Sequence, residues 1–389
     1  MTTTLRVALG ERPIGFLTNL PDDRTIFAFD DEYRADPDRP VLSQSFLEDD
    51  GSLRADGPPV GRLAPPFFSN LLPEGGLRSI AARRLGISPD RDFPLLQHLG
   101  ANLLGAVRLD PSDPLEALAP AGALAFALPG VQLKLSTLLD EDDALTVPAK
   151  HGGAEWIVKV ASGKLRGLVE NEYSMLAFAR SVGIDVPAIK LVDPATIEGL
   201  PAEFDPTGPA LAVRRFDRLD DGTRVHIEDF NQVFGQFPHD KYHHHTQSDI
   251  ARLLNVRAGQ SEARRFIERA VFTAAIANGD MHLKNWSLIY RDGRAPTLAP
   301  AYDYVSTLPY AVDHDLGLSF GGSKDRDVLS EERLRRFARG ADLPFPFVRR
   351  TARAMAERIL DAWPAFDGPL LPEHRVLLDT HIAKTMSGA

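Results

Sequence analysis

Apolar and polar positions alternate in the first 60 residues of the chain. This alternation predicts short strands at residues 5–9, 14–17 and 26–29, with a glycine break after the first and an acidic loop after the last. We therefore expect the chain to begin with a small β-rich subdomain.

The pattern becomes helical from residue 67 to residue 109. Apolar positions recur on one face, and Gly86 stands where a helix would end in a left-handed residue. A second short helix is expected at residues 94–99. The segment 110–122 then concentrates Pro, Asp and Ala, which is typical of a connector between subdomains.

The middle of the chain mixes strand and helix signals. Strands are predicted at residues 132–138 and 155–160, as a hairpin or as neighbours in a sheet. Apolar residues spaced by three and four predict a helix at residues 169–182, and two more strands are expected at 188–192 and 210–216.

Helical patterns dominate after about residue 217. Ser261 is expected to cap a strongly apolar helix that ends at Gly279, and Ser330 is expected to open another. The whole pattern predicts an α+β protein with a mixed front half and a mostly helical back half.

Composition indicates an ordinary globular protein of two or three units. The chain has 389 residues, 43% of them hydrophobic, and 44 Lys and Arg against 54 Asp and Glu give a net charge of −10. Cysteine is absent, which excludes disulfides and thiolate chemistry and makes the cytoplasm the expected compartment. We expect no signal peptide and no membrane span, because no apolar run approaches the roughly 20 residues that a span requires.

Two acids and an amide follow the apolar helix at a spacing that suits phosphoryl transfer. Asp280 precedes Asn285 by five residues, and Asp303 follows later. Protein kinases place a catalytic Asp five residues before an Asn that holds Mg²⁺, and a later Asp completes the metal site. A strand of apolar residues ending in Lys159 supplies the cation that such enzymes direct at the nucleotide phosphates.

Each of these residues alone is weak evidence. Asp280 could simply cap a turn, and a strand lysine such as Lys159 is usually a solvated surface residue. The order favours the kinase interpretation, because a strand lysine, a helix with Glu170 and Glu172, a buried helix and then the acids follow one another as in a bilobal kinase.

Motifs along nearly the whole chain resemble those of one family, the HipA-like toxin serine/threonine kinases of bacterial toxin–antitoxin pairs. The most diagnostic are Asn-Leu-Leu-Pro-Glu-Gly and the Asp-x-His-x-Lys-Asn loop. The motifs that carry the resemblance lie at residues 68–75, 104–107, 130–134, 170–172, 215–218, 226–230, 241–242, 279–285 and 300–303.

The resemblance implies a role for each matching residue. Asp280 would be the catalytic base, Asn285 and Asp303 would bind Mg²⁺, and Lys159 would contact the phosphates of ATP. The adenine hinge would be Val213, Arg214, Arg215 and Phe216, and further nucleotide contacts would come from Gly130, Gln132, Lys134, Glu228, His282 and Lys284. Glu228 and Asp229 together would order the parts that bind the phosphates.

The resemblance also implies a bilobal protein-kinase-like fold. It divides the chain into a HipA-type subdomain at 1–110, an N-lobe-like region at 111–216 and a helical catalytic lobe at 217–389. It implies a dimeric, HipB-like helix-turn-helix antitoxin as partner, contact with DNA only through that complex, and an aminoacyl-tRNA synthetase as target, with growth arrest and persistence as the outcome.

The sequence departs from the family pattern in places. Ala127 stands where the family often has a serine that autophosphorylates, and Ser136 is the nearest hydroxyl. Ile227 replaces a common Gln, and two arginines precede Phe216 where an acidic residue is common. Lys284 has two open interpretations, a contact with the γ-phosphate or a surface residue.

Two other functions compete with the protein kinase. One is a phosphotransferase that acts on a small molecule, and the other is a catalytically silent co-repressor bound to its antitoxin. Histidines 239, 243, 244, 245 and 282 are not expected to form a metal site, and residues 242–246 are better explained by a solvated loop. The arginine-rich C-terminal helices are better explained by a salt-bridged face than by an anionic partner.

Overall fold

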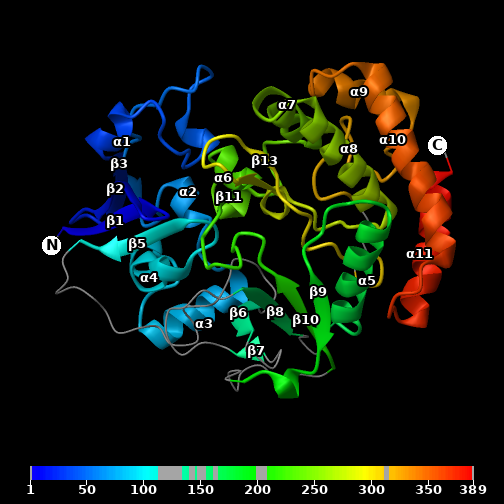
Figure 1. Cartoon of the computed structure of the whole chain (residues 1–389), viewed down its shortest axis with the longest axis horizontal. Coiled ribbons are helices and arrows are strands. Elements are labelled where there is room, and N and C mark those ends of the chain that lie inside the picture. The colour runs from blue at the N-terminus through cyan, green and yellow to red at the C-terminus, as the bar shows by residue number, and fades with distance from the viewer. Residues whose placement is uncertain are drawn as a thin grey trace.

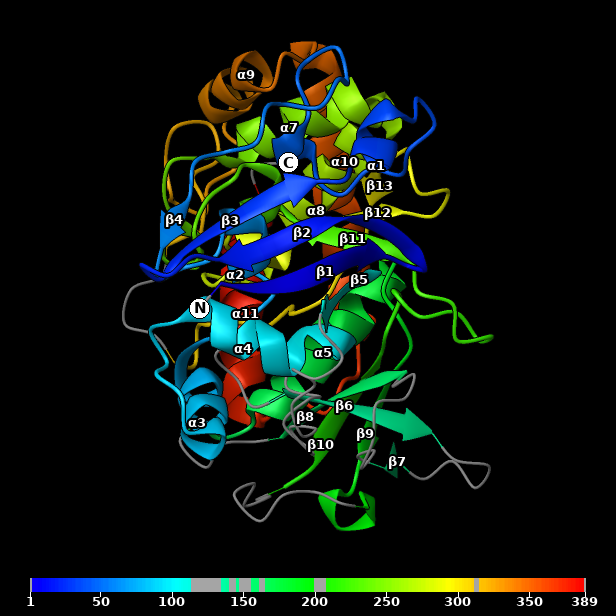
Figure 2. The same cartoon turned by 90° about the vertical axis from the view of Figure 1, so that its left-hand side faces the viewer.

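The structure is a computed structural model, and its cartoon is shown in Figures 1 and 2. It describes residues 2–112, 134–139, 145–146, 155–160, 165–198, 208–310 and 315–387, with the backbone alone at 134–139 and 145–146.

The N-terminal subdomain is built on a five-stranded antiparallel sheet with the order β4-β3-β2-β1-β5, which faces the viewer in Figure 2. The last strand returns from the far end of the subdomain to pair with β1. The predicted helical stretch therefore ends before residue 107, because alternate residues of β5 are needed to close the core. The strands are β1 (Thr3–Leu9), β2 (Arg12–Asn19), β3 (Arg24–Phe29), β4 (Val60–Gly61) and β5 (Val107–Pro111).

Four helices accompany this sheet, and phenylalanine and leucine side chains fill the core between them. Gly86 ends α3 with φ +67, as the sequence predicts, because a residue without a Cβ adopts the left-handed conformation without strain. The helices are α1 (Asp31–Ala35), α2 (Pro66–Ser69), α3 (Gly75–Leu85) and α4 (Asp92–Leu99).

A second antiparallel sheet has the order β7-β6-β8-β10-β9 and lies at the bottom of Figure 1. The first two predicted strands are neighbours as expected, since β6 pairs with β8, and the other two, β9 and β10, also pair with each other. Helix α5 (Leu168–Ser181) contacts β9 and β10. The strands are β6 (Lys134–Leu139), β7 (Leu145–Thr146), β8 (Trp156–Val160), β9 (Ile189–Val192) and β10 (Ala210–Arg214).

The C-terminal lobe is mostly helical, and α8 lies at its centre, fully buried along one face. Gly259 precedes α8 as its N-cap, so the predicted capping role of Ser261 is wrong. Ser330 does precede a helix, α9. The helices are α6 (Phe230–Val233), α7 (Gln247–Arg257), α8 (Gln260–Ala275), α9 (Glu331–Gly340), α10 (Phe345–Ala362) and α11 (Pro372–Met386).

A three-stranded sheet, which the periodicity did not reveal, lies in the same lobe with the order β11-β12-β13. Its strands are β11 (His226–Asp229), β12 (Ser287–Tyr290) and β13 (Thr297–Leu298), and they flank the predicted catalytic loop. Short 3-10 helices are η1 (Gln44–Phe46), η2 (Gly100–Asn102), η5 (Pro194–Thr196), η6 (Pro238–Asp240), η7 (Leu283–Asn285) and η8 (Trp363–Ala365).

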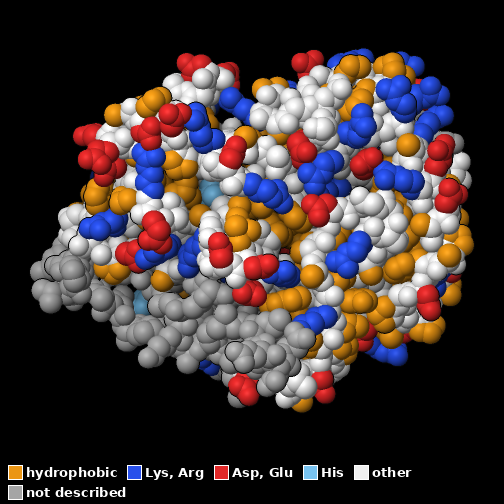
Figure 3. Space-filling model, viewed as in Figure 1, with side chains coloured by type: hydrophobic (Ala, Val, Ile, Leu, Met, Phe, Trp, Pro, Cys, Tyr) orange, Lys and Arg blue, Asp and Glu red, His pale blue; other side chains and the backbone are white. Residues whose placement is uncertain are grey.

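Lys and Arg side chains gather over α9 and α10, at the upper right of Figure 3. Most of these arginines have carboxylate partners: Glu331 pairs with Arg335, Arg349 and Arg353, and Glu332 pairs with Arg336. This face is therefore the salt-bridged surface that the sequence favoured. Among the helices that the structure describes, none is both long and apolar enough to cross a membrane.

Candidate active site

A large cavity lies where the second sheet, the three-stranded sheet and the N-terminal subdomain meet. One part of its wall is apolar and the other carries acids and lysines. The residues used below that line it are Asn70, Glu74, Leu104, Ile157, Lys159, Glu172, Val213, Arg214, Arg215, Phe216, Ile227, Asp229, Lys241, Asp280, His282, Lys284, Asn285, Tyr302 and Asp303.

The loop after α8 places Asp280 and Asn285 together. The Asn285 side-chain amide donates a hydrogen bond to the backbone carbonyl of Asp280, with N···O 2.9 Å. The backbone N–H of Asp280 donates to the side chain of Asn278 at 3.1 Å. These two bonds fix the loop from both ends, and they leave the Asn285 amide oxygen as a possible metal ligand.

Lys159 on β8 lies between two carboxylates, those of Glu172 on α5 and Asp303. Burial opposes the charge on Lys159, but the nearby Asp303 and Glu172 carboxylates outweigh it and raise the pKa of the ammonium. Asp303 has φ +54, a left-handed conformation that costs a non-glycine residue energy. Strain of this kind is concentrated at functional sites, which agrees with a role for Asp303.

The predicted hinge lines the apolar part of the cavity. Val213 and Arg214 end β10, and Phe216 follows with its ring 5.8 Å from that of Tyr302. Leu104 and Ile157 add apolar surface. This wall is suited to a flat, uncharged ring system such as adenine.

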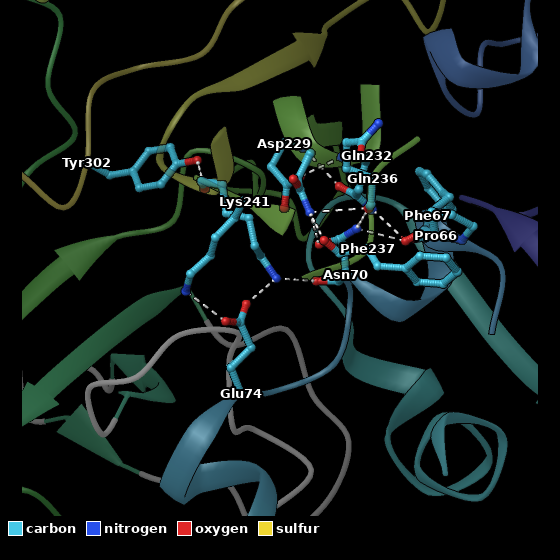
Figure 4. Close-up of polar contacts among 12 residues, drawn as sticks. Pro66, Phe67, Asn70, Glu74, Asp229, Gln232, Gln236, Phe237, Lys241 and Tyr302 are labelled. Atoms are coloured by element: carbon cyan, nitrogen blue, oxygen red, sulfur yellow. Dashed lines mark hydrogen bonds and ion pairs between the residues drawn. The ribbon is translucent and has the colours of Figure 1, made fainter. Parts of the chain in front are cut away.

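Glu74 reaches into the polar part of the cavity from the N-terminal subdomain, and its carboxylate lies between two lysine ammonium groups (Figure 4). The Glu74 oxygens are 2.9 Å from Lys241 Nζ and 2.5 Å from Lys284 Nζ. Burial alone would raise the pKa of Glu74, but the charges of Lys284 and Lys241 outweigh it and lower the pKa to about 2. Lys284 is therefore a buried member of the site, and its interpretation as a surface lysine is wrong.

The segment that carries Glu74 is fastened to the catalytic lobe by its own polar groups (Figure 4). Asn70 accepts a hydrogen bond from Asn231 at 3.0 Å, and its backbone carbonyl accepts one from Lys284 at 3.1 Å. Gln232 donates to the carbonyl of Phe67 at 2.9 Å. The diagnostic Asn-Leu-Leu-Pro-Glu-Gly motif is thus the part of the N-terminal subdomain that enters the active site.

A second buried contact joins the two regions behind the hinge. The Asp217 carboxylate accepts bonds from Arg215 at 2.7 Å and from the backbone N–H of Gly105 at 2.8 Å. Arg218 donates to the Gly105 carbonyl at 2.9 Å. Gly105 has φ +68, and a Cβ there would lie 2.8 Å from the backbone nitrogen of Ile227. Two more of the diagnostic motifs therefore meet each other across this interface.

Burial shifts two further groups in the cavity. It raises the pKa of Asp229 to about 6, although the Lys284 charge opposes the shift. It lowers the pKa of His282 to about 3, helped by the Lys241 charge, so the imidazole is neutral at pH 7. The carboxylates and lysines of this region, not His282, carry its charge.

The structure brings together most of the residues predicted from the sequence. Lys159, the four hinge residues, His282, Lys284, Asn285, Asp303 and Asp280 all line one cavity. Glu228 does not: its carboxylate accepts from Tyr290 and from the backbone N–H of Gln44, away from the cavity. The adjacent Asp229 lines the cavity instead, because successive residues of a strand point to opposite sides. Gly130, Gln132 and the Lys134 side chain lie outside the described residues.

Glu74 and its partner Lys241 were not assigned to the site from the sequence. Glu74 and Lys241 belong to motifs that the resemblance quoted, but nothing in their spacing shows that they pair. A signal was available for Glu74, since an acid within so diagnostic a motif on an otherwise apolar segment needs a cationic partner if it is buried.

The donor set suits a divalent cation with phosphates attached. Asp303 and Asn285 offer the oxygen ligands that Mg²⁺ prefers, within reach of the same cavity as Asp280. Lys241 and Lys284 offer charge to phosphate oxygens, and the apolar wall accepts a base. The residues present therefore fit Mg²⁺ and a nucleoside triphosphate.

Comparisons with known proteins agree over nearly the whole chain. The sequence profile of the HipA-like C-terminal domain matches residues 126–363, and that of the HipA N-terminal domain matches residues 5–110. A protein of Sinorhizobium fredii named "Putative kinase Y4dM" is 44% identical, over 97% of this chain and 96% of its own length. A second from that organism, "Putative kinase Y4mE", is 29% identical, over 83% and 85%.

A solved structure shows a similar fold. It is HipA of Shewanella oneidensis MR-1, in a toxin–antitoxin complex with HipB and operator DNA, with a TM-score of 0.76 and 21% identity. The match covers 99% of this chain and 96% of that one. The bilobal kinase-like fold expected from the sequence is thereby confirmed.

Proposed function

The chain belongs to the family of HipA-like proteins, and from that premise and the geometry of the cavity we propose that it is an ATP- and Mg²⁺-dependent serine/threonine protein kinase. We propose further that it is the toxin of a toxin–antitoxin pair and acts in the cytoplasm.

One observation carries the proposal: Lys159, Glu172, Asp303, Asp280 and Asn285 meet in a single cavity although they come from four separate parts of the chain. A lysine paired with a helix glutamate, next to a metal-binding Asp, is the arrangement that protein kinases need for activity. A silent binding module has no use for all of these groups together.

Each side chain has a task in the transfer. Asp280 orients the acceptor hydroxyl and takes its proton, and Asn285 and Asp303 would hold Mg²⁺. The metal, when bound, neutralises charge on the transferring phosphoryl group. Lys159 and Lys284 place their ammonium groups toward the phosphates, and the hinge wall holds the adenine.

The partners follow from the family. The similar Shewanella HipA is found with HipB and operator DNA, which supports a HipB-like helix-turn-helix antitoxin for this chain and contact with DNA through that complex. An aminoacyl-tRNA synthetase is the target we propose. Its phosphorylation would arrest growth, which is the effect expected of a toxin and the basis of persistence.

The test is incubation of the purified protein with γ-labelled ATP, Mg²⁺ and an extract of its host, followed by identification of labelled proteins. Asp280→Ala and Asp303→Asn variants run beside it, with Asp367→Asn as control, because Asp367 is an exposed loop residue far along the chain. We expect a discrete labelled protein that both active-site variants lose and the control retains.

The other outcomes separate the competing functions. Transfer to small alcohols without labelled protein would show a small-molecule phosphotransferase. ATP binding with no transfer at all would contradict the kinase proposal and leave a co-repressor module.

A further inference from the structure

Tyr242 makes a contact that the proposed mechanism does not use. Its phenolic hydroxyl donates a hydrogen bond to the carboxylate of Asp280. A general base must lie within hydrogen-bond reach of the proton that it removes, and this is the relation that the hydroxyl of an acceptor would have to Asp280. Tyr242 therefore presents a hydroxyl to the proposed base as an acceptor would.

The ring of Tyr242 is held in this position from two sides. The ring of His282 lies edge-on at a centroid distance of 5.0 Å. The ammonium of Lys241 lies 5.7 Å from the centre of the Tyr242 ring and is itself paired with Glu74 at 2.9 Å. The hydroxyl is thus placed by the same lysine that helps to form the phosphate end of the cavity.

Asp280 borders two hollows, and Tyr242 belongs to the second. The first is the nucleotide cavity. The second is a shallower hollow lined by Tyr242, Gly279, Asp280, Thr307, Leu316 and Lys324, among others. An acceptor on Asp280 has to come from a side that ATP does not fill, and the second hollow is such a side.

The hydroxyls of Tyr290, Tyr302, Tyr310 and Thr307 are bonded to groups other than Asp280. The Tyr302 hydroxyl donates to the backbone carbonyl of Lys284 at 3.0 Å, and that of Tyr290 donates to Glu228. Tyr310 is hydrogen-bonded to Asn171 at 3.4 Å. The Thr307 hydroxyl donates to the carbonyl of Ala277 at 2.9 Å. The contact with Asp280 distinguishes Tyr242 from these.

We propose that Tyr242 is an autophosphorylation site, modified within the same molecule. This inference rests on the kinase function proposed above. The phenolic oxygen attacks the γ-phosphorus of ATP, a new O–P bond forms, the bond from the γ-phosphorus to the β-bridging oxygen breaks, and ADP leaves. The phenolic proton passes to the Asp280 carboxylate.

A tyrosine serves here even in an enzyme whose protein substrates carry serine or threonine. A tethered acceptor does not depend on recognition by the substrate site, because fixing a group beside the reacting centre raises its effective concentration by many orders of magnitude. The fold itself holds the phenol of Tyr242 next to Asp280.

Modification of Tyr242 would silence the kinase. A phosphate adds about two negative charges beside Asp280, which repels both a further acceptor and the phosphates of ATP. It also fills the hollow through which an acceptor reaches the base.

The test is incubation of the purified full-length protein with γ-labelled ATP and Mg²⁺, followed by phosphoamino-acid analysis and mapping of the labelled peptide. We expect phosphotyrosine at Tyr242, formed at a rate per molecule that does not change with protein concentration. Tyr242→Phe should lower self-labelling by about tenfold or more, since the tethered acceptor is gone. The Tyr242→Phe variant should also phosphorylate host proteins for a longer time after addition of ATP than the unchanged protein does.

Two variants serve as controls. Tyr310→Phe removes a partly buried tyrosine whose hydroxyl bonds Asn171, and self-labelling should not change. Asp280→Asn should abolish both self-labelling and labelling of host proteins.

The outcomes separate this inference from the kinase proposal. Labelled host proteins with no phosphate on Tyr242, or with self-labelling at Ser136 instead, would overturn the assignment of Tyr242 and leave the kinase intact. Dependence of the rate on protein concentration would overturn modification within one molecule. No labelling of any kind would contradict both proposals together.

Discussion

Two clusters of charged side chains in the cavity are built with opposite composition. In one, the ammonium of Lys159 lies between the carboxylates of Glu172 and Asp303. In the other, the carboxylate of Glu74 lies between the ammonium groups of Lys241 and Lys284. We call them the acidic cluster and the basic cluster.

The difference in charge decides what each cluster can bind. The acidic cluster has a surplus of one negative charge and attracts a cation, and the basic cluster has a surplus of one positive charge and attracts an anion. A nucleotide with its Mg²⁺ carries both kinds of charge. Two neighbouring clusters of opposite surplus in one cavity can therefore orient it, because each end of the ligand has one favourable place.

The two clusters also differ in where their residues come from. The acidic cluster belongs to the part of the chain that resembles ordinary kinases. The basic cluster is completed by Glu74, which lies on the N-terminal subdomain. Because Glu74 pairs with both lysines, the N-terminal subdomain forms part of the candidate active site.

The largest expected effect comes from removing a charge from the acidic cluster. Asp303→Asn cancels its negative surplus and takes away a proposed ligand of Mg²⁺, so phosphoryl transfer should fall by about 1,000-fold. The measurement is the rate of ADP formation over a range of Mg²⁺ concentrations. If the normal rate returned at high Mg²⁺, the role of Asp303 would be limited to strengthening metal binding.

Lys159→Met removes the ammonium group that lies between the two carboxylates of the acidic cluster. The two carboxylates are left facing each other while buried, and loss of one partner from a buried pair costs about 3–5 kcal/mol of stability. We expect transfer to fall by about 100-fold and the unfolding midpoint in urea to drop. Lys190→Met on β9 of the same sheet is the control, because Lys190 packs on the Trp156 ring outside the cavity. An equal loss in both variants would mean that Lys159 acts only on folding.

Glu74→Gln tests the basic cluster. The surplus positive charge rises, so ATP should bind a few-fold more tightly, whereas kcat should fall about tenfold because the two ammonium groups are no longer tied in place. The measurement is nucleotide titration beside steady-state kinetics.

General damage to the fold would weaken ATP binding and lower kcat together, so the opposite directions are diagnostic for Glu74. The matched control is Glu11→Gln in the same subdomain, where the side chain is 96% exposed. Weaker ATP binding in Glu74→Gln would contradict the anion-binding role of the basic cluster.

The smallest effect is a pH dependence that arises from Asp229, whose pKa burial raises to about 6. Asp229 is protonated below that pH and negatively charged above it. The new charge lies near Lys284, so the affinity for ATP should fall about two- to threefold as the pH rises from 5 to 7.

Asp229→Asn should remove this pH dependence and keep the fold. Asp229 caps α6 by accepting a hydrogen bond from the backbone of Gln232 at 2.8 Å, and asparagine caps helices equally well. An unchanged pH profile in this variant would show that the titrating group is another one.

The sequence predicted the elements and the residues of the catalytic loop better than it predicted the basic cluster. Strand and helix periodicity identified β8, α5 and the helix before Asp280, and the spacing of Asp280, Asn285 and Asp303 indicated a metal and a base. These residues are close in the chain or belong to one motif. Glu74 and Lys241 are separated by more than 160 positions, and no local pattern records that they pair.

The errors have physical causes of the same kind. Glu228 was placed near the nucleotide together with Asp229, and only Asp229 lines the cavity, because the motif does not say which face of β11 is turned to it. Ser261 was expected to cap α8, but the helix begins two residues earlier, after Gly259. In each case a choice between nearby residues depends on which side packs against the rest of the molecule.

The sequence by itself determined the family, the α+β class, and the residue types that a phosphoryl transfer needs, because these follow from periodicity and from motifs of contiguous residues. Only the tertiary structure decided that Glu74 pairs two lysines, that Lys284 is buried, and that Tyr242 meets Asp280. Such contacts depend on how distant segments of the chain pack together. The role of a buried charged side chain depends on which partners lie next to it in the folded protein.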